Sequence, residues 1–404
     1  MADSSDRVVV VSQQYPPDRS GNASRIRDTC AHLADEGWDV TVLAPPPAFP
    51  HGQFDRTWTR RSTDRIDGVT VHRLWAWQPT ATDPSFLSRM AYYLLFPFHA
   101  LLWLAVHLRG YDAVVTSSPP IFTGIVGLPI GLLGLRPWIV DVRDLWIDAA
   151  VGLEFIADGG LVERASRQYE RLVLRTADRI TVTTSVLGDR LVDRYGVDGS
   201  AVRHVPNGVD TDTYRPTDAD REPTIVYTGN VGHAQALDTC VRAMASVETP
   251  EATLRIVGDG DVTDRLRRLA ADVGVADRVE FTGLLPRESI PAELDAAMVG
   301  VAPLKPDPTL AYAVPTKAYE YMSCALPVVA TGVGEIESLM RTSGGGVLVD
   351  DDADELAAAF DALLSDPDRR RRLGASGRAH VIERYDRGVV ARTVSGILAE
   401  VTDG

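Results

Sequence analysis

The chain has 404 residues, 45% of them hydrophobic, and a formal net charge of −15 at pH 7. This length favours two domains over one core, and the apolar content is ordinary for a soluble globular protein. The acidic balance argues against a nucleic-acid-binding protein, which needs a basic surface.

Acidic residues outnumber basic ones along the whole chain, and only Lys305 and Lys317 are lysines. This composition is typical of halophilic proteins and concerns the solvent, not the substrate. The three cysteines fit no zinc spacing and suggest reduced thiols in a cytoplasmic setting. The opening MADSSDRVVVVSQQ has too short an apolar run for a signal peptide.

The first half alternates apolar strands with amphipathic segments. Four valines at 8–11 suit a strand buried on both faces, and residues 23–36 place their apolar side chains on one helical face. Further strands are expected at DVTVLA, YDAVVTS, PWIVDV and DRITVTT. The pattern predicts a doubly wound parallel sheet.

The second half repeats this pattern after the turn signals of HVPNGVDTDTYRP. Strands are expected at TIVYTG, TLRIVG, RVEFTG, MVGVAPL, PVVATG and GGVLV. We therefore predict an α/β fold of two Rossmann-like domains that face each other across a cleft. The domains are 1–205 and 206–385, and a final helix at 386–404 packs back on the first domain.

Several strands end in glycine-containing loops, in SGNASR, YTGNVGHAQALD and IVGDGDVTDRL. Glycine allows a ligand to approach the backbone, and the helix that follows offers free amides and a positive dipole end. Such junctions suit a diphosphate. Each one alone is better explained as a glycine that ends a strand, and it is their occurrence in both halves that favours a phosphate site.

Lys317 and Glu320 lie three residues apart, on one face of a helix that is predicted to start at Pro315 and Thr316. A lysine in the first helical turn opposes the helix dipole unless an anion is bound there. Glu320 suits hydrogen bonds from a vicinal diol such as a ribose. The alternative is a surface ion pair that stabilises little.

Nearly the whole chain resembles the family 4 glycosyltransferases, which have the two-domain GT-B fold. The resemblance rests on YPPDRSGNASRIRDTCAHLADEGWDVTVL, VPNGVDTDTYRP, YTGNVGHAQALDTCVRAM, LRIVGDGD, VEFTGLLPRESIPAELDAAMVGVAPL and PTKAYEYMSCALPVV. The Arg-Asp-Leu-Trp segment in DVRDLWID is similar to the WbuB-like branch of bacterial N-acetylfucosaminyl transferases.

The resemblance implies roles for specific residues. Glu320 matches the second glutamate of the family's Glu-x7-Glu motif, which holds the donor ribose, and Lys317 would lie against the donor diphosphate. The remaining expected substrate contacts, with Pro315 and Thr316 at the helix start, are Gly21 and Asn22 near the reacting sugar, Gly229, Asn230 and Gly232 on the phosphate side, and Gly258, Asp259 and Gly260 on the base side.

The chain departs from the family pattern at three places. The first glutamate of the motif falls on Tyr312. The cations that many relatives place after the first strand of the second domain fall on Asn230 and Gln235, which leaves Lys317 to face the diphosphate. A histidine used by many relatives aligns with Arg143, beside Asp144. Asp144 would accept a proton or orient the acceptor, or else cap the turn that follows.

Metal binding is not expected. Asp-x-Asp patterns occur at 210–212, 259–261 and 350–352, but so acidic a chain produces them by chance. A diphosphate held by a lysine and by helix N-termini requires no metal.

Residues 90–108 contain no Asp, Glu, Lys or Arg and are long enough to span a bilayer. Pro97 and two histidines favour instead a helix lying at the membrane interface, near 86–109. Phe96 and Trp103 are among its expected lipid-facing side chains, and arginines from Arg56 to Arg73 would add local positive charge. The alternative is a buried helix with solvated arginines.

The expected activity is that of a retaining glycosyltransferase, hexosyl or N-acetylhexosaminyl. It would use a nucleotide-sugar donor and a lipid-linked acceptor in surface polysaccharide or glycoprotein glycan assembly. The protein would be peripheral on the cytoplasmic face of the membrane. Two alternatives stay open: a sugar-nucleotide 2-epimerase on the same fold, and a non-catalytic partner subunit.

Overall fold

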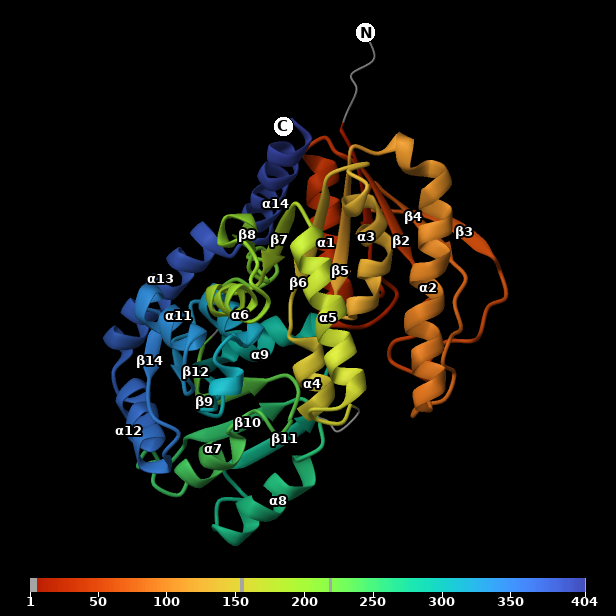
Figure 1. Ribbon diagram of the computed structural model, residues 1–404. Coiled ribbons are helices and arrows are strands. Elements are labelled where there is room, and N and C mark those ends of the chain that lie inside the picture. Colours follow the sequence, from red (N-terminus) through yellow and green to blue (C-terminus); the bar gives the residue numbers. More distant parts are fainter. Residues whose placement is uncertain (1–5, 153–155, 218–219, 404) are drawn as a thin grey trace. The chain divides into compact units, whose positions relative to one another are not determined.

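The computed structural model describes residues 6–152, 156–217 and 220–403 (Figure 1). The described chain forms two compact units. The first runs up to Pro206 and also includes the chain from Val390 onward, and the second is Asn207–Val389. Each unit contains one sheet with helices packed on it.

The first unit is built on an eight-stranded sheet whose central strands are apolar and buried. Its strands are parallel except for one antiparallel hairpin, β3–β4. In sheet order they are β3 (Arg61–Ile66), β4 (Val69–Leu74), β2 (Asp39–Ala44), β1 (Arg7–Val11), β5 (Ala113–Ser118), β6 (Trp138–Val142), β7 (Arg179–Val182) and β8 (Val202–His204).

Helices connect these strands. The Ser20 hydroxyl caps the first one by accepting from the Ala23 amide. The helices are α1 (Gly21–Asp35), α2 (Phe86–His107), α3 (Gly124–Leu132), α4 (Trp146–Gly152), α5 (Leu161–Thr176) and α6 (Ser185–Tyr195), with short 3₁₀ turns η1 (Leu108–Gly110), η2 (Ile121–Thr123) and η3 (Gly199–Ala201).

The second unit has a six-stranded, fully parallel sheet. Its strands are β11 (Val279–Gly283), β10 (Thr253–Val257), β9 (Glu222–Thr228), β12 (Ala297–Ala302), β13 (Val328–Ala330) and β14 (Gly346–Leu348). Its helices are α7 (Leu237–Ala243), α8 (Thr263–Asp272), α9 (Ile290–Ala296), α10 (Thr316–Ser323), α11 (Glu335–Ser343), α12 (Ala353–Leu364) and α13 (Pro367–Arg384), with η4 (Arg287–Ser289) and η5 (Pro308–Leu310).

The predicted return of the C-terminal helix to the first unit is confirmed. In α14 (Arg387–Thr402), Val390, Ile397 and Leu398 belong to the same buried cluster as the valines of β1. The Trp38 indole donates a hydrogen bond of 2.9 Å to Ser395 of this helix. The α/β prediction of two Rossmann-like units is confirmed with it.

Each sheet has one point where the strand order reverses. Strand β1 lies between β2 and β5, and β9 lies between β10 and β12. In open α/β sheets, ligands bind at the carboxyl ends of the strands that flank such a point. The loops that follow β1 and β9 are therefore where a site is expected in each unit.

The β3–β4 hairpin was not predicted. It changes which of the nearby arginines lie at the surface. Arg73 was expected at the surface, but it is buried and donates to the carbonyl oxygens of Pro45 (3.1 Å) and Tyr15 (3.3 Å). This guanidinium supports the loop after β1 and cannot attract lipid. Arg60, Arg61 and Arg65 remain exposed.

Helix α2 has a buried face and an exposed face. Tyr92, Phe96, Ala100 and Leu104 are buried in the first unit. The expectation that Phe96 faces lipid is therefore wrong. Trp103 is partly buried, 4.0 Å from the His107 ring by centroids. The large apolar side chains of this helix that do face outward are Phe86, Leu87, Leu95, Phe98, Leu102 and Val106.

Candidate functional site

The backbone at the end of β9 is closely packed against the neighbouring loop, with glycines at the contact. Gly229 and Gly258 have φ of 119° and 140°, a conformation that favours glycine. A Cβ on Gly258 would lie 1.9 Å from the Gly229 carbonyl oxygen, so only glycine fits there. The Gly229 amide donates to Val257 at 2.8 Å and the Gly258 amide to Gly283 at 2.9 Å. These bonds tie the ends of β9, β10 and β11 into one edge.

Lys317 reaches this edge from the first turn of α10. Its ammonium lies 3.6 Å from the centroid of the Tyr227 ring, and a Cβ on Gly229 would be 3.4 Å from its Nζ. In the part of the chain that the structure describes, this ammonium forms no salt bridge, so the surface ion pair with Glu320 is not present. Burial lowers the pKa of Lys317 to about 7, and Glu320 opposes that shift.

Glu320 lies one turn further along α10 and is partly buried. Burial raises the pKa of its carboxyl, while Arg287, Lys317 and a hydrogen bond with Tyr214 act in the opposite direction. Arg287 belongs to η4, after β11, and was not predicted as a site residue. The only signal for it was a basic residue soon after a strand of the second sheet.

Hydrogen bonds within the loop after β9, and from Tyr227 of that strand, fix the conformation of the loop. The Gly232 amide donates to the Gln235 carboxamide at 3.1 Å, and the Tyr227 hydroxyl donates to the Asn230 carbonyl. Gln235, where many relatives were expected to carry a cation, is thus used inside the loop. Asn230 is exposed beside Gly229.

Asp259 and Gly260 form the turn that leads into α8. The Asp259 carboxylate accepts from the Thr263 hydroxyl and the Gly260 amide, each at 2.8 Å, and these bonds lower its pKa. A Cβ on Gly260 would lie 2.5 Å from the Val231 carbonyl oxygen. Asp259 is exposed and shapes this edge.

The connection from β12 to α10 contains three further predicted residues. Tyr312 is partly buried in that connection, Pro315 occupies the N-cap position of α10, and Thr316 is its first residue and exposed. Because β12 flanks the reversal point, the connection and the glycine loop lie at the same end of the sheet. The arrangement offers an ammonium, helix amides and a carboxylate to a phosphorylated diol.

A second cluster lies in the first unit, at the carboxyl end of β6. Arg143 Nε contacts Asp141 at 2.8 Å, and Arg143 Nη1 donates to the Asn22 carboxamide oxygen of α1. Gly21 begins α1, and a Cβ there would meet nothing within 4 Å. The Asp144 carboxylate accepts from the Leu145 amide at 2.8 Å. This last bond is the turn cap that was the alternative role for Asp144.

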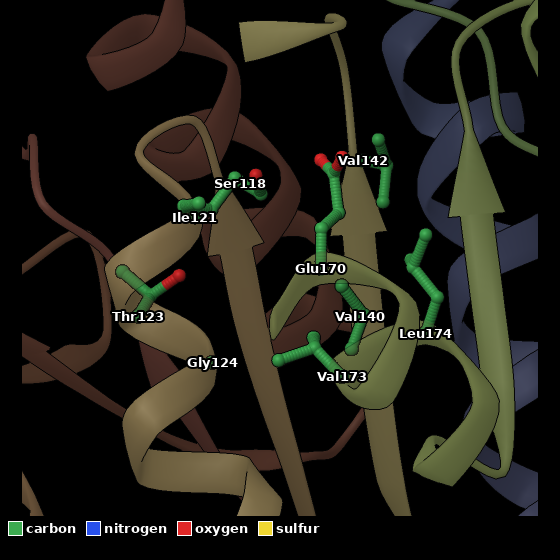
Figure 2. A pocket seen from close by; sticks show the side chains of 9 residues that line it. All are labelled: Ser118, Ile121, Thr123, Gly124, Val140, Val142, Glu170, Val173 and Leu174. Carbon is green, nitrogen blue, oxygen red and sulfur yellow. The ribbon is translucent and has the colours of Figure 1, made fainter. Parts of the chain in front are cut away.

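The cavity in Figure 2 is not a substrate site. It lies between α3, α5 and the sheet of the first unit and has a volume of about 10 Å³, room for about one water. The buried Glu170 carboxylate that points into it accepts a hydrogen bond from the Tyr195 hydroxyl. This pair belongs to the packing of α5 on α6.

Among the described residues, no group of three or more His, Cys, Asp or Glu side chains is placed to hold a metal ion. One helical stretch, Phe86–Gly110, is long and apolar enough to cross a membrane by length and composition. Of the most apolar 18 residues of this stretch, 33% are buried in the protein.

Two family models match the chain. One, described as a glycosyl transferase 4-like domain, matches residues 20–208, and the other, glycosyl transferases group 1, matches residues 222–366. Together they cover most of both units.

Two similar proteins are informative. The D-inositol 3-phosphate glycosyltransferase of Nocardia farcinica is 32% identical over 253 residues, which is 57% of this chain and 55% of that protein. The GDP-mannose-dependent alpha-(1-6)-phosphatidylinositol monomannoside mannosyltransferase of Mycolicibacterium smegmatis is 27% identical, over 65% of this chain and 77% of that protein. The chain spans little more than half the length of the first relative.

Solved structures share the fold over nearly the whole chain. Sucrose-phosphate synthase from Thermosynechococcus elongatus has a TM-score of 0.76 at 21% identity, covering 98% of this chain and 99% of that one. Anabaena HepE in complex with UDP has a TM-score of 0.71 at 16% identity, covering 98% and 100%.

Proposed function

We propose that the chain is a family 4 glycosyltransferase of GT-B fold, which transfers a sugar from a nucleotide diphosphate sugar to a hydroxyl acceptor. One relative is named for D-inositol 3-phosphate and the other for GDP-mannose, while HepE holds UDP. These names favour a nucleotide-sugar donor. The finer proposal places the chain in the N-acetylfucosaminyl-like branch, with a hexosyl or N-acetylhexosaminyl donor. The branch assignment is supported by a basic turn into an apolar stretch and by the segment DVRDLWID that follows.

The observation that carries the proposal is the ammonium of Lys317, which faces the glycine edge without a salt bridge. When the bond from the sugar's anomeric carbon to the diphosphate breaks, the electron pair goes to the leaving phosphate oxygen. An ammonium and the first-turn amides of α10 stabilise that charge best where water is scarce. Glu320 would hold the ribose, with Arg287 and Tyr214 keeping its carboxylate in place.

On the acceptor side, the hydroxyl oxygen forms the new bond to the anomeric carbon and its proton must leave. Asp144, at the carboxyl end of β6, is our candidate to orient that hydroxyl or take the proton. The family implies retention of anomeric configuration. The proposal includes no metal, since Lys317 and helix amides supply the charge that an ion would otherwise provide.

We also propose that the acceptor is lipid-linked and that the exposed face of α2 lies on the cytoplasmic surface of the membrane. Leu95, Phe98, Leu102 and Val106 follow a spacing of three to four residues, so they form one face, with exposed fractions from 40% to 80%. Arg89 and Arg109 flank this stretch, which itself contains no acidic side chain. Such a face suits an interfacial helix better than a soluble partner.

The test is a deletion strain complemented with wild-type or Lys317→Met protein, followed by mass spectrometry of lipid-linked glycans. We expect a glycan truncated by one sugar in the deletion strain. The wild type should restore it, Glu337→Gln on the exposed face of α11 should also restore it, and Lys317→Met should not. Full-length lipid-linked glycans in the deletion strain would contradict the proposal.

A further inference from the structure

An exposed tryptophan is held in place at the surface of the first unit. Trp58, in the connection from β2 to β3, is 69% exposed, and its ring stacks on Trp75 with centroids 6.1 Å apart and an interplanar angle of 21°. Trp75 is the first residue after β4. The neighbouring Thr57 amide donates to the carboxamide of the buried Gln78 at 2.6 Å. These contacts restrict the Trp58 ring while leaving most of it in solvent.

A guanidinium lies beside this ring. The Arg56 Cζ lies 3.8 Å from the centroid of the Trp77 ring and 6.0 Å from that of Trp58. Its Nε and Nη2 donate to the Gln78 carbonyl oxygen at 3.3 and 3.2 Å. Nη1 has no acceptor among the described residues. This nitrogen is therefore able to donate to an oxygen of a ligand that covers Trp58. We call Arg56, Trp58, Trp75 and Trp77 the tryptophan platform.

The tryptophan platform lies at the edge of the sheet where ligands are expected. Strand β4 runs parallel to β2 and β1, and β3 pairs antiparallel with β4, with Arg61 opposite Leu74. The segment before β3 and the segment after β4 therefore leave the sheet at its carboxyl edge, as the loop after β1 does. In the sheet order β4 is two strands from β1, about 10 Å at the usual strand spacing. An oligosaccharide covers that distance, and a single sugar does not.

The exposed neighbours of Trp58 along the chain are polar and carry both charges. They are Asp55, Thr59, Arg60 and Arg61. A polyanion needs a basic surface, and a tryptophan in a membrane interface has apolar neighbours that enter the lipid. This mixed surface instead favours a neutral, hydroxylated ligand. The hydrogens on one face of a pyranose ring form an apolar surface that fits an indole ring, and the hydroxyls at its rim accept from a guanidinium.

We propose that the tryptophan platform binds a sugar ring of the acceptor's glycan, away from the hydroxyl that receives the new sugar. This inference rests on the proposed function, since it names the acceptor as an oligosaccharide. The ring stacks on Trp58, and Arg56 Nη1 donates to one of its hydroxyls. Because the platform touches no reacting atom, it contributes to the affinity for the acceptor and not to the chemical step.

The probe is the pool of oligosaccharides released by mild acid from a lipid extract of the deletion strain, which accumulates the unextended acceptor. Saturation-transfer NMR should show that the pool binds the full chain. Trp58→Ala should weaken binding by about fivefold or more, and Trp58→Phe, which keeps an aromatic face, should weaken it less. Leu133→Ala, at the end of α3 and also 69% exposed, is the matched control. In turnover with the intact extract, Trp58→Ala should raise the acceptor KM by the same factor at unchanged kcat.

Three results would overturn the inference. The first is that the pool does not bind the wild-type chain, and the second is that it binds Trp58→Ala with wild-type affinity. The third is that Trp58→Ala no longer floats with vesicles of phosphatidylethanolamine and phosphatidylglycerol that carry the wild type, since the ring would then face lipid. Because the ring is exposed, Trp58→Ala should unfold at the wild-type denaturant concentration, which separates lost binding from lost structure. Absence of turnover with pool binding intact would count against the proposed function alone.

Discussion

At the scale of single residues, Lys317 makes donor binding sensitive to pH. Because the pKa of Lys317 is about 7 in the free protein, its side-chain amine is largely uncharged above pH 7. Anion binding then has to take up a proton, so UDP affinity should fall between pH 7 and 9, by up to about tenfold per pH unit. The phosphates of UDP are already ionised between pH 7 and 9, so the change in affinity reports on Lys317.

Calorimetric titrations of UDP at pH 7, 8 and 9, in two buffers of different ionisation enthalpy, measure both the affinity and the proton uptake. Lys317→Arg keeps its charge throughout and should give a flat profile. A wild-type affinity that does not change between pH 7 and 9 would show that Lys317 does not face the diphosphate.

Glu320 should contribute to binding of the nucleoside part of UDP and not to binding of its phosphates. Glu320→Gln removes the charge that accepts hydrogen bonds from the ribose, which should weaken UDP binding by about tenfold to a hundredfold. Inorganic pyrophosphate, which has no ribose, should bind as tightly as before. Glu337→Gln on the solvent side of α11 is the matched control. Equal losses for UDP and pyrophosphate would place Glu320 at the phosphates instead.

Residue-scale prediction from the sequence worked where a local pattern exists. Lys317 and Glu320 share a predicted helix start, and both lie in α10 as expected. Whether they bind a nucleotide stays a prediction. Arg287 and the Arg143–Asn22 bond could not be predicted, because the partners come from distant segments whose meeting depends on the fold.

At the scale of elements, the exposed face of α2 is the testable feature. Changing Phe98 and Leu102 to Ser should leave the fold intact, because both side chains are exposed. Each should lose about 1.5–3 kcal/mol of burial in lipid. In liposome flotation at molar KCl, the double variant should shift from the lipid to the soluble fraction.

Phe96→Ser is the contrasting variant for this helix. Phe96 is fully buried, so its loss should lower the free energy of unfolding by about 3–5 kcal/mol. If wild-type protein stays in the soluble fraction at every salt concentration, the exposed face of α2 contacts something other than lipid.

Strands buried on both faces were predictable, since runs such as RVVVV and TIVYT have no solvent face. The β3–β4 hairpin was missed because β3, RSTDRI, is an exposed edge strand with charged side chains and no apolar alternation. Its arginines resembled a basic surface stretch, and nothing local distinguishes the buried Arg73 from the exposed ones.

At the scale of the whole molecule, the C-terminal helix belongs to the first unit, and the stability of that unit should depend on it. Leu398→Ala should destabilise the first unit by about 2–5 kcal/mol, because the side chain is fully buried in its core. All seven tryptophans precede Pro206, so their fluorescence during denaturant unfolding reports on this unit. Arg392→Ala, an exposed change on the same helix, should have little effect.

UDP binding should persist in Leu398→Ala, because the second unit has its own buried clusters. An unchanged unfolding midpoint would contradict the packing of α14, and loss of nucleotide binding would show that the two units do not fold independently.

The most direct test is turnover by the purified chain, supplied with a panel of nucleotide sugars and a lipid extract from the same cells. We predict that nucleoside diphosphate is released only when the extract is present, that EDTA does not change the rate, and that Lys317→Met lowers it at least a hundredfold. Conversion of the donor to an epimer without the extract, or equal turnover by Lys317→Met, would contradict a glycosyltransferase that uses this lysine.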